Sequence, residues 1–340
     1  FDVTVPRVPP PFGTLKEFSM KICIIGGGGL VGQKLATALA KRGTLKGQSI
    51  STLVLADVVN PAPIDAPFAV ERVTCDITNT ASVAKVIDAD TDVIYLLAAI
   101  VSGQAEEEFD LGYSINMFGT MNVLERVRSL GTKATVVFTS SIAVFGGDVP
   151  DPITDNSFLN PQTSYGAQKA AGELMINDYS RKGFVDGRAF RLPTISVRPG
   201  KPNRAASGFM LSIFRESLQG QEAVCPVSRD FPHYYLSPRK CIENLIKGAE
   251  IPAENLGQNR AMTMPGRTWT IGQMIDAMTA VTGPEAETRI KFEEQPEIWE
   301  IVKGWRFDIR ADKALSLGLE ADKSFEDNIR YFIEDDKAAS

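Results

Sequence analysis

Tyr165 and Lys169 lie four residues apart in a helix-patterned stretch of the chain. Side chains at positions i and i+4 share one face of a helix, so both groups can reach one bound molecule. A free tyrosine titrates near ~10, but a neighbouring cation stabilises the phenolate and lowers its pKa. We interpret the pair as an acid–base unit in which Tyr165 moves a proton and Lys169 supplies the cation. The same spacing occurs on ordinary amphipathic helices, so other parts of the chain must support this interpretation.

A phosphate-binding turn is predicted near the start of the chain. An apolar run, 21–25, and a helix-patterned segment, 33–42, flank a glycine-rich turn. Its first glycine permits the tight turn, the second lets the backbone approach a diphosphate, and the third lets the helix pack on the strand. The alternative is a sharp strand-to-helix connection that binds nothing. The residues assigned to the cofactor here are Gly26, Gly29, Leu30, Val31 and Gly32.

The choice between NAD and NADP depends on Asp57, which ends the next strand-like run, 51–56. A carboxylate at this position hydrogen-bonds the free 2′-hydroxyl of the adenosine ribose and repels a 2′-phosphate. The sequence therefore predicts NAD as the cofactor. The alternative is an aspartate that only caps the irregular loop predicted at 58–67.

Small and polar residues follow three further apolar runs, 69–74, 92–99 and 134–138. The carboxyl ends of parallel strands face the ligand crevice of such a sheet. Asn116 lies in a long segment predicted as one helix, 104–130, where its amide can bond its neighbours or hold a water for proton relay. The residues at the predicted strand ends are Asp76, Ile77, Ala98, Ala99, Ser140 and Ser141.

Strands and helices alternate up to about residue 197, which predicts an α/β fold with a Rossmann-type doubly wound parallel sheet. We expect an NAD-binding domain at 20–197 and a smaller, mainly helical substrate-binding part at 198–340, with some segments returning to the first domain. Residues 1–19 are interpreted as a leader or tag-like extension, because Met20 directly precedes the first strand. The helices expected in the second part are 208–219, 238–249, 271–282 and 325–334.

The composition argues against several classes of function. A net charge of −6 and a pI near 5.1 disfavour a nucleic-acid surface. No apolar run reaches the roughly 18 residues that a membrane span needs. The single histidine, His233, leaves no basis for a metal site or a histidine-based triad. The four scattered cysteines predict buried thiols in a reducing cytoplasm rather than disulfides; they are Cys23, Cys75, Cys225 and Cys241.

Taken together, these features resemble the extended short-chain dehydrogenase/reductase family. The resemblance covers about residues 20–200 and includes the glycine turn, Asp57, Asp76-Ile77, Leu97-Ala98-Ala99, Asn116, Gly119-Thr120, Ser140-Ser141, Tyr165 and Lys169. It implies that Tyr165 is the catalytic acid/base, that Lys169 holds the nicotinamide ribose and lowers the pKa of Tyr165, and that Ser141 orients the reacting oxygen.

The resemblance also implies roles outside this central group. Asn116 corresponds to the proton-relay position, and Pro193-Thr194 to the segment beside the nicotinamide. Helices near 104–130 and 161–181 correspond to the pair through which family members form homodimers. Two positions depart from the pattern: Leu96 stands where many members have histidine, and Ser141 is followed by Ile142-Ala143 rather than by two acids. The second departure disfavours the nucleotide-sugar dehydratases.

Several arginines in the second half are candidates for substrate binding. An arginine fork binds a carboxylate at two points. Arg239, at the start of a predicted helix, is expected to receive a substrate carboxylate with Arg204 and Ser102, while Ser140, Ser141 and Tyr165 hold the reacting hydroxyl. The loop 198–204 adds Arg198 to the cations near the predicted nicotinamide site. The alternative is that these arginines are solvated or pair with acids of the chain.

The segments 198–209, 221–227 and 236–239 are similar to those of the D-erythronate dehydrogenase group of this family, and the resemblance extends from Met20 almost to the end of the chain. The resemblance implies NAD-dependent oxidation of D-erythronate, or a similar small sugar acid, at C2 to the 2-keto acid. One rival is a nucleoside-diphosphate-sugar epimerase that retains its NAD and shows no net redox change. Another is a non-catalytic NAD-sensing protein, against which the intact set of Ser141, Tyr165 and Lys169 argues.

Overall fold

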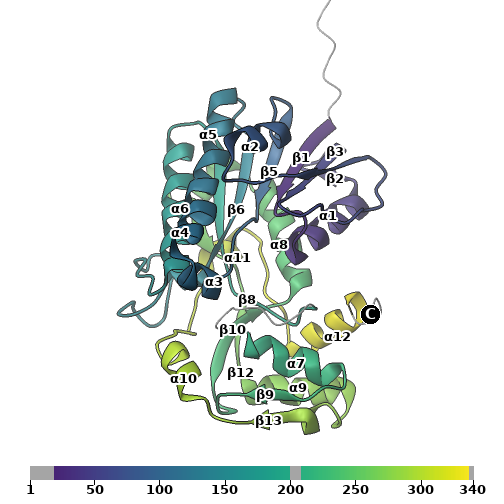
Figure 1. Ribbon diagram of the computed structural model, residues 1–340, viewed down its shortest axis with the longest axis vertical. Coiled ribbons are helices and arrows are strands. Elements are labelled where there is room, and N and C mark those ends of the chain that lie inside the picture. The colour runs from purple at the N-terminus through teal and green to yellow at the C-terminus, as the bar shows by residue number, and fades with distance from the viewer. Residues whose placement is uncertain (1–18, 200–207, 337–340) are drawn as a thin grey trace, which may run out of the picture.

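The structure, a computed structural model, describes residues 19–199 and 208–336. An eight-stranded sheet forms its larger part (Figure 1). In spatial order its strands are β11 (Ala261–Thr263), β7 (Asp186–Leu192), β6 (Thr135–Ser141), β5 (Thr91–Leu96), β1 (Ser19–Ile25), β3 (Gln48–Asp57) and β2 (Thr44–Leu45), with β4 (Ala69–Thr74) also paired to β3. All of these pairings are parallel except the β2–β3 hairpin.

Helices cover both faces of this sheet, which confirms the doubly wound Rossmann-type prediction. One face carries α1 (Leu30–Arg42) and α8 (Pro238–Glu250), and the other carries α2 (Thr80–Val86), α5 (Thr120–Leu130) and α6 (Ser164–Arg181) (Figure 1). Because both faces are covered, the central strands β1, β5 and β6 are apolar on both sides and lie between two separate clusters of buried side chains.

The segment 104–130, predicted as one helix, is interrupted. It consists of α3 (Ser102–Glu107), α4 (Phe109–Gly112), a π-helix η1 (Tyr113–Gly119) and then α5. The backbone of Glu108 leaves the helical region, with φ −112° and ψ 68°. Two glycines in this stretch let other segments approach closely: a Cβ on Gly112 would meet Gln168 at 2.6 Å, and one on Gly119 would meet Ile77 at 2.6 Å. These close approaches are tertiary contacts that helical periodicity does not reveal.

The predicted run 92–99 is also shorter as a strand, because β5 ends at Leu96. The amides of Leu97 and Ala98 both donate to the carbonyl of Ile25, at 2.8 and 3.0 Å. Because both amides bond one carbonyl, the regular pairing of β5 with β1 ends after Leu96, and the chain continues beside the glycine turn.

The smaller part contains three of the four helices expected from the sequence, one further helix, α10, and two small sheets that the sequence pattern did not predict (Figure 1). Its third core of buried side chains includes Phe214, Met274 and Phe325. The helices are α7 (Phe209–Leu218), α9 (Ile271–Thr282), α10 (Pro296–Val302) and α12 (Phe325–Asp335). The sheets are β8 (Thr194–Ile195) with β10 (Pro232–Leu236) and β12 (Arg267–Thr270), and β9 (Ala223–Cys225) with β13 (Ile290–Phe292).

Three segments beyond residue 198 belong to the larger part by their contacts. β11 pairs with β7, α8 packs on α1, and α11 (Asp312–Ser316) packs on β11. The boundary between 20–197 and 198–340 stays a prediction. Within residues 19–199 and 208–336, no helix has the length and apolar character of a membrane span.

Candidate active site

The first turn of α6 brings Tyr165 against Ser141 at the end of β6. Thr163 caps this helix by accepting a bond from the Gly166 amide at 3.1 Å, and Ser141 accepts one from the Ala143 amide at 3.1 Å. A side chain on Gly166 would collide with the Ala143 carbonyl oxygen, so the glycine permits the close approach. The Tyr165 hydroxyl lies close enough to the Ser141 side chain for that hydroxyl to lower the pKa of Tyr165.

Lys169 lies one turn further along α6 and is buried. Its Nζ donates to the Thr139 carbonyl at 2.9 Å and lies 5.6 Å from the centre of the Tyr165 ring. Burial lowers the pKa of Lys169 to about 7 and raises the pKa of Tyr165 to about 12. The rise at Tyr165 is opposed by the hydrogen bond with Ser141 and by the charge of Arg198. The structure therefore places both members of the pair together, and the charge of Arg198 also favours the phenolate of Tyr165.

Ser140 does not face the same side as Ser141. Its hydroxyl donates to Glu173 Oε1 at 2.6 Å inside the protein, and Glu173 is also bound by both the Nε and Nη2 groups of Arg191. Successive residues of a strand point to opposite faces, so only one of the two serines can reach Tyr165. The prediction that Ser140 holds the substrate hydroxyl is therefore wrong. The Ser140–Glu173–Arg191 network was missed, because a Glu on a helix and an Arg on a strand give no sequence signal that they meet.

Asn116 is buried in the π-helix and bonds its neighbours. Its Oδ1 accepts from the Ile100 amide at 2.9 Å, and its Nδ2 donates to the Ile100 carbonyl at 3.3 Å and to Gln168 Oε1 at 2.7 Å. Both amide hydrogens are thus used within the protein. The side chain ties α6 to the segment after β5, and a relay role for Asn116 stays a prediction.

The glycine turn has the shape of a phosphate-binding turn. A Cβ on Gly26 would lie 2.6 Å from the Ala98 amide nitrogen, and one on Gly32 would collide with the Gly26 carbonyl oxygen. Gly29 is the N-cap of α1, which no described side chain caps, and a Cβ on Gly29 would have space around it. The amides of Leu30 and Val31 follow in the first turn, so the helix N-terminus is open to an anion.

Asp57, at the end of β3, lies next to this turn, as its position in the sequence predicts. Its Oδ2 accepts from the Gly28 amide at 2.9 Å, which holds the carboxylate against the glycine turn. Asp76 is exposed and accepts two bonds from Thr78, at 2.9 and 2.8 Å. It therefore closes a local turn, while Ile77 is buried against Gly119. Cofactor contacts for Asp76, Ile77, Leu97, Ala98 and Ala99 stay predictions.

Pro193 and Thr194 connect the two parts of the protein. Thr194 begins β8, which pairs with β10, and a 2.6 Å hydrogen bond joins its Oγ1 to His233 Nε2. Burial lowers the pKa of His233 to about 3, so the ring is neutral, and it packs against Trp305 and Phe307. The histidine therefore fixes the position of the predicted nicotinamide segment.

The structure does not support Arg239 as a substrate ligand. Its guanidinium is bound by two acids of α12, at 2.8 Å from Glu334 and 2.6 Å from Asp335, and lies over the Tyr331 ring. The guanidinium of Arg239 is thus already bound by carboxylates of the same chain. This agrees with the alternative prediction, that the arginines of the second half pair with acids of the chain. Arg204 lies outside the described residues, and a substrate contact for Ser102, half-buried at the start of α3, stays a prediction.

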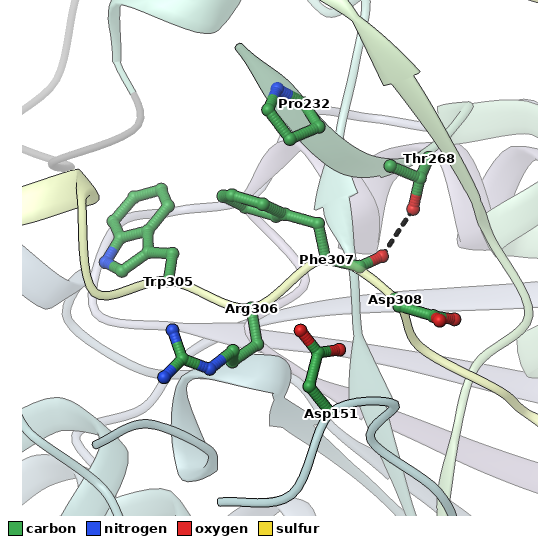
Figure 2. Close-up of a pocket in the computed structure, with 7 residues that line it drawn as sticks. All are labelled: Asp151, Pro232, Thr268, Trp305, Arg306, Phe307 and Asp308. Atoms are coloured by element: carbon green, nitrogen blue, oxygen red, sulfur yellow. Dashed lines mark hydrogen bonds between the residues drawn. The ribbon is translucent and has the colours of Figure 1, made fainter. Parts of the chain in front are cut away.

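A cavity of about 430 Å³ opens between the two parts of the protein. Figure 2 shows that the Trp305 and Phe307 rings lie on one side of their segment and Arg306 on the other. Arg306 donates to the Gly147 carbonyl at 3.4 Å, and Thr268 donates to the Phe307 carbonyl. The lining residues are Asp151, Pro232, Thr268, Trp305, Arg306, Phe307 and Asp308. None of the predicted catalytic residues is among them, so we assign this cavity no role in the chemistry.

The described residues contain no cluster of His, Cys, Asp and Glu able to hold a metal ion. All four cysteines are buried and unpaired. Burial raises the pKa of the Cys23 and Cys241 thiols, which keeps them protonated at neutral pH.

Comparisons with known proteins agree with this geometry. The model of the NAD dependent epimerase/dehydratase family matches residues 22–233. The chain is 46% identical to the D-erythronate dehydrogenase of Cupriavidus necator, over 93% of this chain and 98% of that protein. It is 43% identical to the D-erythronate dehydrogenase of Haemophilus influenzae, over 93% of this chain and 100% of that protein.

Two solved structures are similar along almost the whole chain. A nucleoside-diphosphate-sugar epimerase from Agrobacterium tumefaciens superimposes with a TM-score of 0.91 at 44% identity, over 100% of this chain and 99% of that one. A GalE-like L-threonine dehydrogenase from Cupriavidus necator, in its holo form, gives a TM-score of 0.79 at 26% identity, over 92% of this chain and 99% of that one.

Proposed function

Because the chain belongs to the NAD dependent epimerase/dehydratase family, we propose that it is an NAD-dependent dehydrogenase that oxidises D-erythronate, or a similar small sugar acid, at C2 to the 2-keto acid. The observation that carries the proposal is the contact between Tyr165 and Ser141 with Lys169 buried beside them, in a chain 46% identical to a D-erythronate dehydrogenase. The reaction needs a group that accepts a proton, a group that accepts a hydride and a group that binds the carboxylate of the substrate.

The residues present fit NAD. The uncapped N-terminus of α1 suits the diphosphate, and the carboxylate of Asp57 suits the adenosine ribose. Lys169 is proposed to hold the nicotinamide ribose, with Pro193 and Thr194 beside the ring. Bound NAD supplies the hydride acceptor. The chain itself supplies the groove and the proton-transfer groups.

In the proposed reaction, Ser141 and Tyr165 bind the C2 hydroxyl of the substrate. Tyr165 takes the hydroxyl proton as the C2–H bond breaks and its electron pair leaves with the hydride, so that a C2 carbonyl forms. The positive charges of Lys169 and Arg198 stabilise the phenolate that accepts this proton. The proton is then released to solvent by way of Lys169, with Asn116 at the proposed relay position.

Spectrophotometry tests the function directly. Purified protein supplied with NAD and D-erythronate should produce NADH absorbance, and a panel of four- to six-carbon aldonates should identify the preferred acid. Absence of NADH with every acid of the panel would contradict the proposal.

A second candidate function is nucleoside-diphosphate-sugar epimerisation, which the similarity to the Agrobacterium tumefaciens protein favours. An epimerase uses the same proton-transfer groups but regenerates its cofactor within each turnover. Protein purified with NAD still bound, and turnover of UDP- or GDP-sugars without net NADH, would decide for the epimerase over the dehydrogenase.

Replacing Asp57 with Ala should relax the choice of cofactor. The carboxylate is held over the glycine turn by the Gly28 amide, so removing it takes away both the ribose contact and the repulsion of a 2′-phosphate. We expect kcat/KM with NAD to fall about 10- to 100-fold, as for loss of a hydrogen bond to a charged group, and the preference for NAD over NADP to shrink. Asp276→Ala is the matched control, since that carboxylate pairs with Arg229 at the surface of the smaller part, and unchanged cofactor preference in Asp57→Ala would contradict the prediction.

We also propose that the protein forms a homodimer through α4, η1 and α6. Four large apolar side chains on these elements are exposed: Phe109 at 55%, Leu111 at 37%, Phe118 at 47% and Leu174 at 64%. Exposed apolar groups gathered on neighbouring helices are typical of protein–protein contacts. A second copy of the chain would cover them by pairing the same helices, as the family resemblance implies.

A cytoplasmic location completes the proposal. It is supported by the four buried, unpaired cysteines, because a reducing compartment keeps such thiols free.

A further inference from the structure

Gln168 precedes Lys169 on α6 and lies where α6 packs against the π-helix η1. Its side chain is fully buried, and its Oε1 accepts a hydrogen bond from Asn116 Nδ2 at 2.7 Å. Gly112 permits this close packing, because a Cβ on Gly112 would lie 2.6 Å from Gln168 Nε2. Gln168 therefore bonds the helix of the predicted acid–base pair to η1.

Asn116 extends this bond to the segment 97–100, which follows β5. Its side chain bonds both backbone groups of Ile100, accepting from the amide at 2.9 Å and donating to the carbonyl at 3.3 Å. At the other end of the segment, the Leu97 amide donates to the Ile25 carbonyl at 2.8 Å, directly before the glycine turn. A chain of hydrogen bonds thus joins α6 to the segment that is predicted to line the cofactor.

Lys169 is held from a different direction. Its Nζ donates to the Thr139 carbonyl of β6 at 2.9 Å, whereas Gln168 bonds η1. Consecutive residues of an α-helix point about 100° apart, so these two bonds attach one turn of α6 to two different neighbours. Together they restrict the rotation of that turn about the helix axis. Without the Gln168 bond, the direction of the Lys169 side chain is fixed by one of the two hydrogen bonds alone.

The polar end of Gln168 has a cost that an apolar side chain would avoid. Its Nε2 is buried and has no hydrogen-bond partner among the described residues. A buried donor without a partner is unfavourable, and a methionine of similar length would fill the same space without one. The feature of Gln168 that methionine lacks is the Oε1 acceptor for Asn116. This bond, rather than packing alone, is therefore what the amide contributes.

We propose that Gln168 is a positioning residue: through Asn116 it fixes α6 against the segment 97–100 and so holds Lys169 in place to bind the nicotinamide ribose. The inference rests on the proposed function, in which Lys169 binds that ribose. Gln168 is buried from solvent, so it acts through Lys169 rather than by touching the reacting atoms.

The test compares the affinity for NAD with that for ADP, which has the adenosine and the diphosphate but no nicotinamide ribose. In Gln168→Met, calorimetry should show NAD binding weakened about 10-fold, the effect of about one hydrogen bond, and ADP binding within about twofold of the unchanged protein. Gly112→Ala should give the same pattern, because its Cβ displaces the Gln168 amide. Ile176→Val trims a fully buried side chain on the same helix, and as the matched control it should leave both affinities unchanged.

Hydrogen exchange of the protein without NAD provides a second readout. The Ile100 amide is bonded to Asn116, whose side chain loses its attachment to α6 in Gln168→Met. Mass spectrometry should therefore show the peptide spanning 97–101 exchanging about 10-fold faster in this variant. In Ile176→Val the same peptide should exchange at the rate of the unchanged protein.

Three results overturn the inference: unchanged NAD binding in Gln168→Met, equal weakening of NAD and ADP, or loss of turnover in Asn116→Ala without any loss in Gln168→Met. The first would mean that Gln168 only fills space, and the second that the whole groove is damaged. The third would mean that Asn116 acts in proton relay independently of Gln168. Selective loss of NAD affinity with faster exchange supports the inference even if no sugar acid is oxidised, a result that contradicts the proposed function alone.

Discussion

Replacing Tyr165 with Phe is expected to lower kcat for sugar-acid oxidation by about 100- to 10,000-fold, the range for loss of a positioned general base. The substitution removes only the hydroxyl that bonds Ser141 and keeps the ring that packs beside Lys169. Binding of NAD, followed by fluorescence titration, should stay within about threefold, because the predicted cofactor contacts at the glycine turn and Asp57 are untouched. Steady-state NADH formation measures the loss.

Tyr179 provides the matched control for this substitution. It lies on the same helix, but its hydroxyl bonds Glu125 away from the predicted site. Tyr179→Phe should therefore leave kcat unchanged. If Tyr165→Phe kept its activity, Tyr165 would not be the proton acceptor, and the assignment of the active site would be wrong.

The parts of the site that could be predicted from the sequence are those fixed by local spacing. Tyr165 and Lys169 share a helix face, and the turn around Gly26 joins a strand to a helix, so each arrangement is set by a few consecutive residues. Their relative placement follows from the strand order of a doubly wound sheet, which brings the ends of β1 and β6 to one edge.

The parts that could not be predicted depend on partners far away in the chain. The sequence made Arg239 a reasonable ligand for a substrate carboxylate. In the structure it is bound instead by Glu334 and Asp335 of α12, which lie 95 and 96 residues later in the chain. Ser140 and Ser141 look equivalent in sequence, yet the pleat of β6 turns one toward Glu173 and leaves the other beside Tyr165. The helix is also interrupted at Glu108, where no Gly or Pro in the sequence marks a break. A motif of a few consecutive residues predicts none of these three features.

Replacing Glu173 with Ala is expected to destabilise the protein by about 3–5 kcal/mol, the range for leaving one partner of a buried ion pair alone. Glu173 and Arg191 are 1% and 3% exposed, and their paired atoms lie 2.8–3.1 Å apart. The substitution also removes the acceptor of the Ser140 hydroxyl. Urea unfolding followed by circular dichroism measures the change in the free energy of unfolding.

Two companion variants decide whether the loss comes from the buried charge. Asp178, on the same helix, pairs with Arg181 at the surface, so Asp178→Ala should change the stability by no more than about 1 kcal/mol. The double variant Glu173→Met with Arg191→Met removes both charges and fills the space with apolar atoms, and it should cost less than Glu173→Ala alone. If the double variant were as unstable as the sum of its two single variants, Glu173 and Arg191 would have no energetic coupling. That outcome would contradict the prediction, because the loss in Glu173→Ala would then not come from leaving the Arg191 charge without its partner.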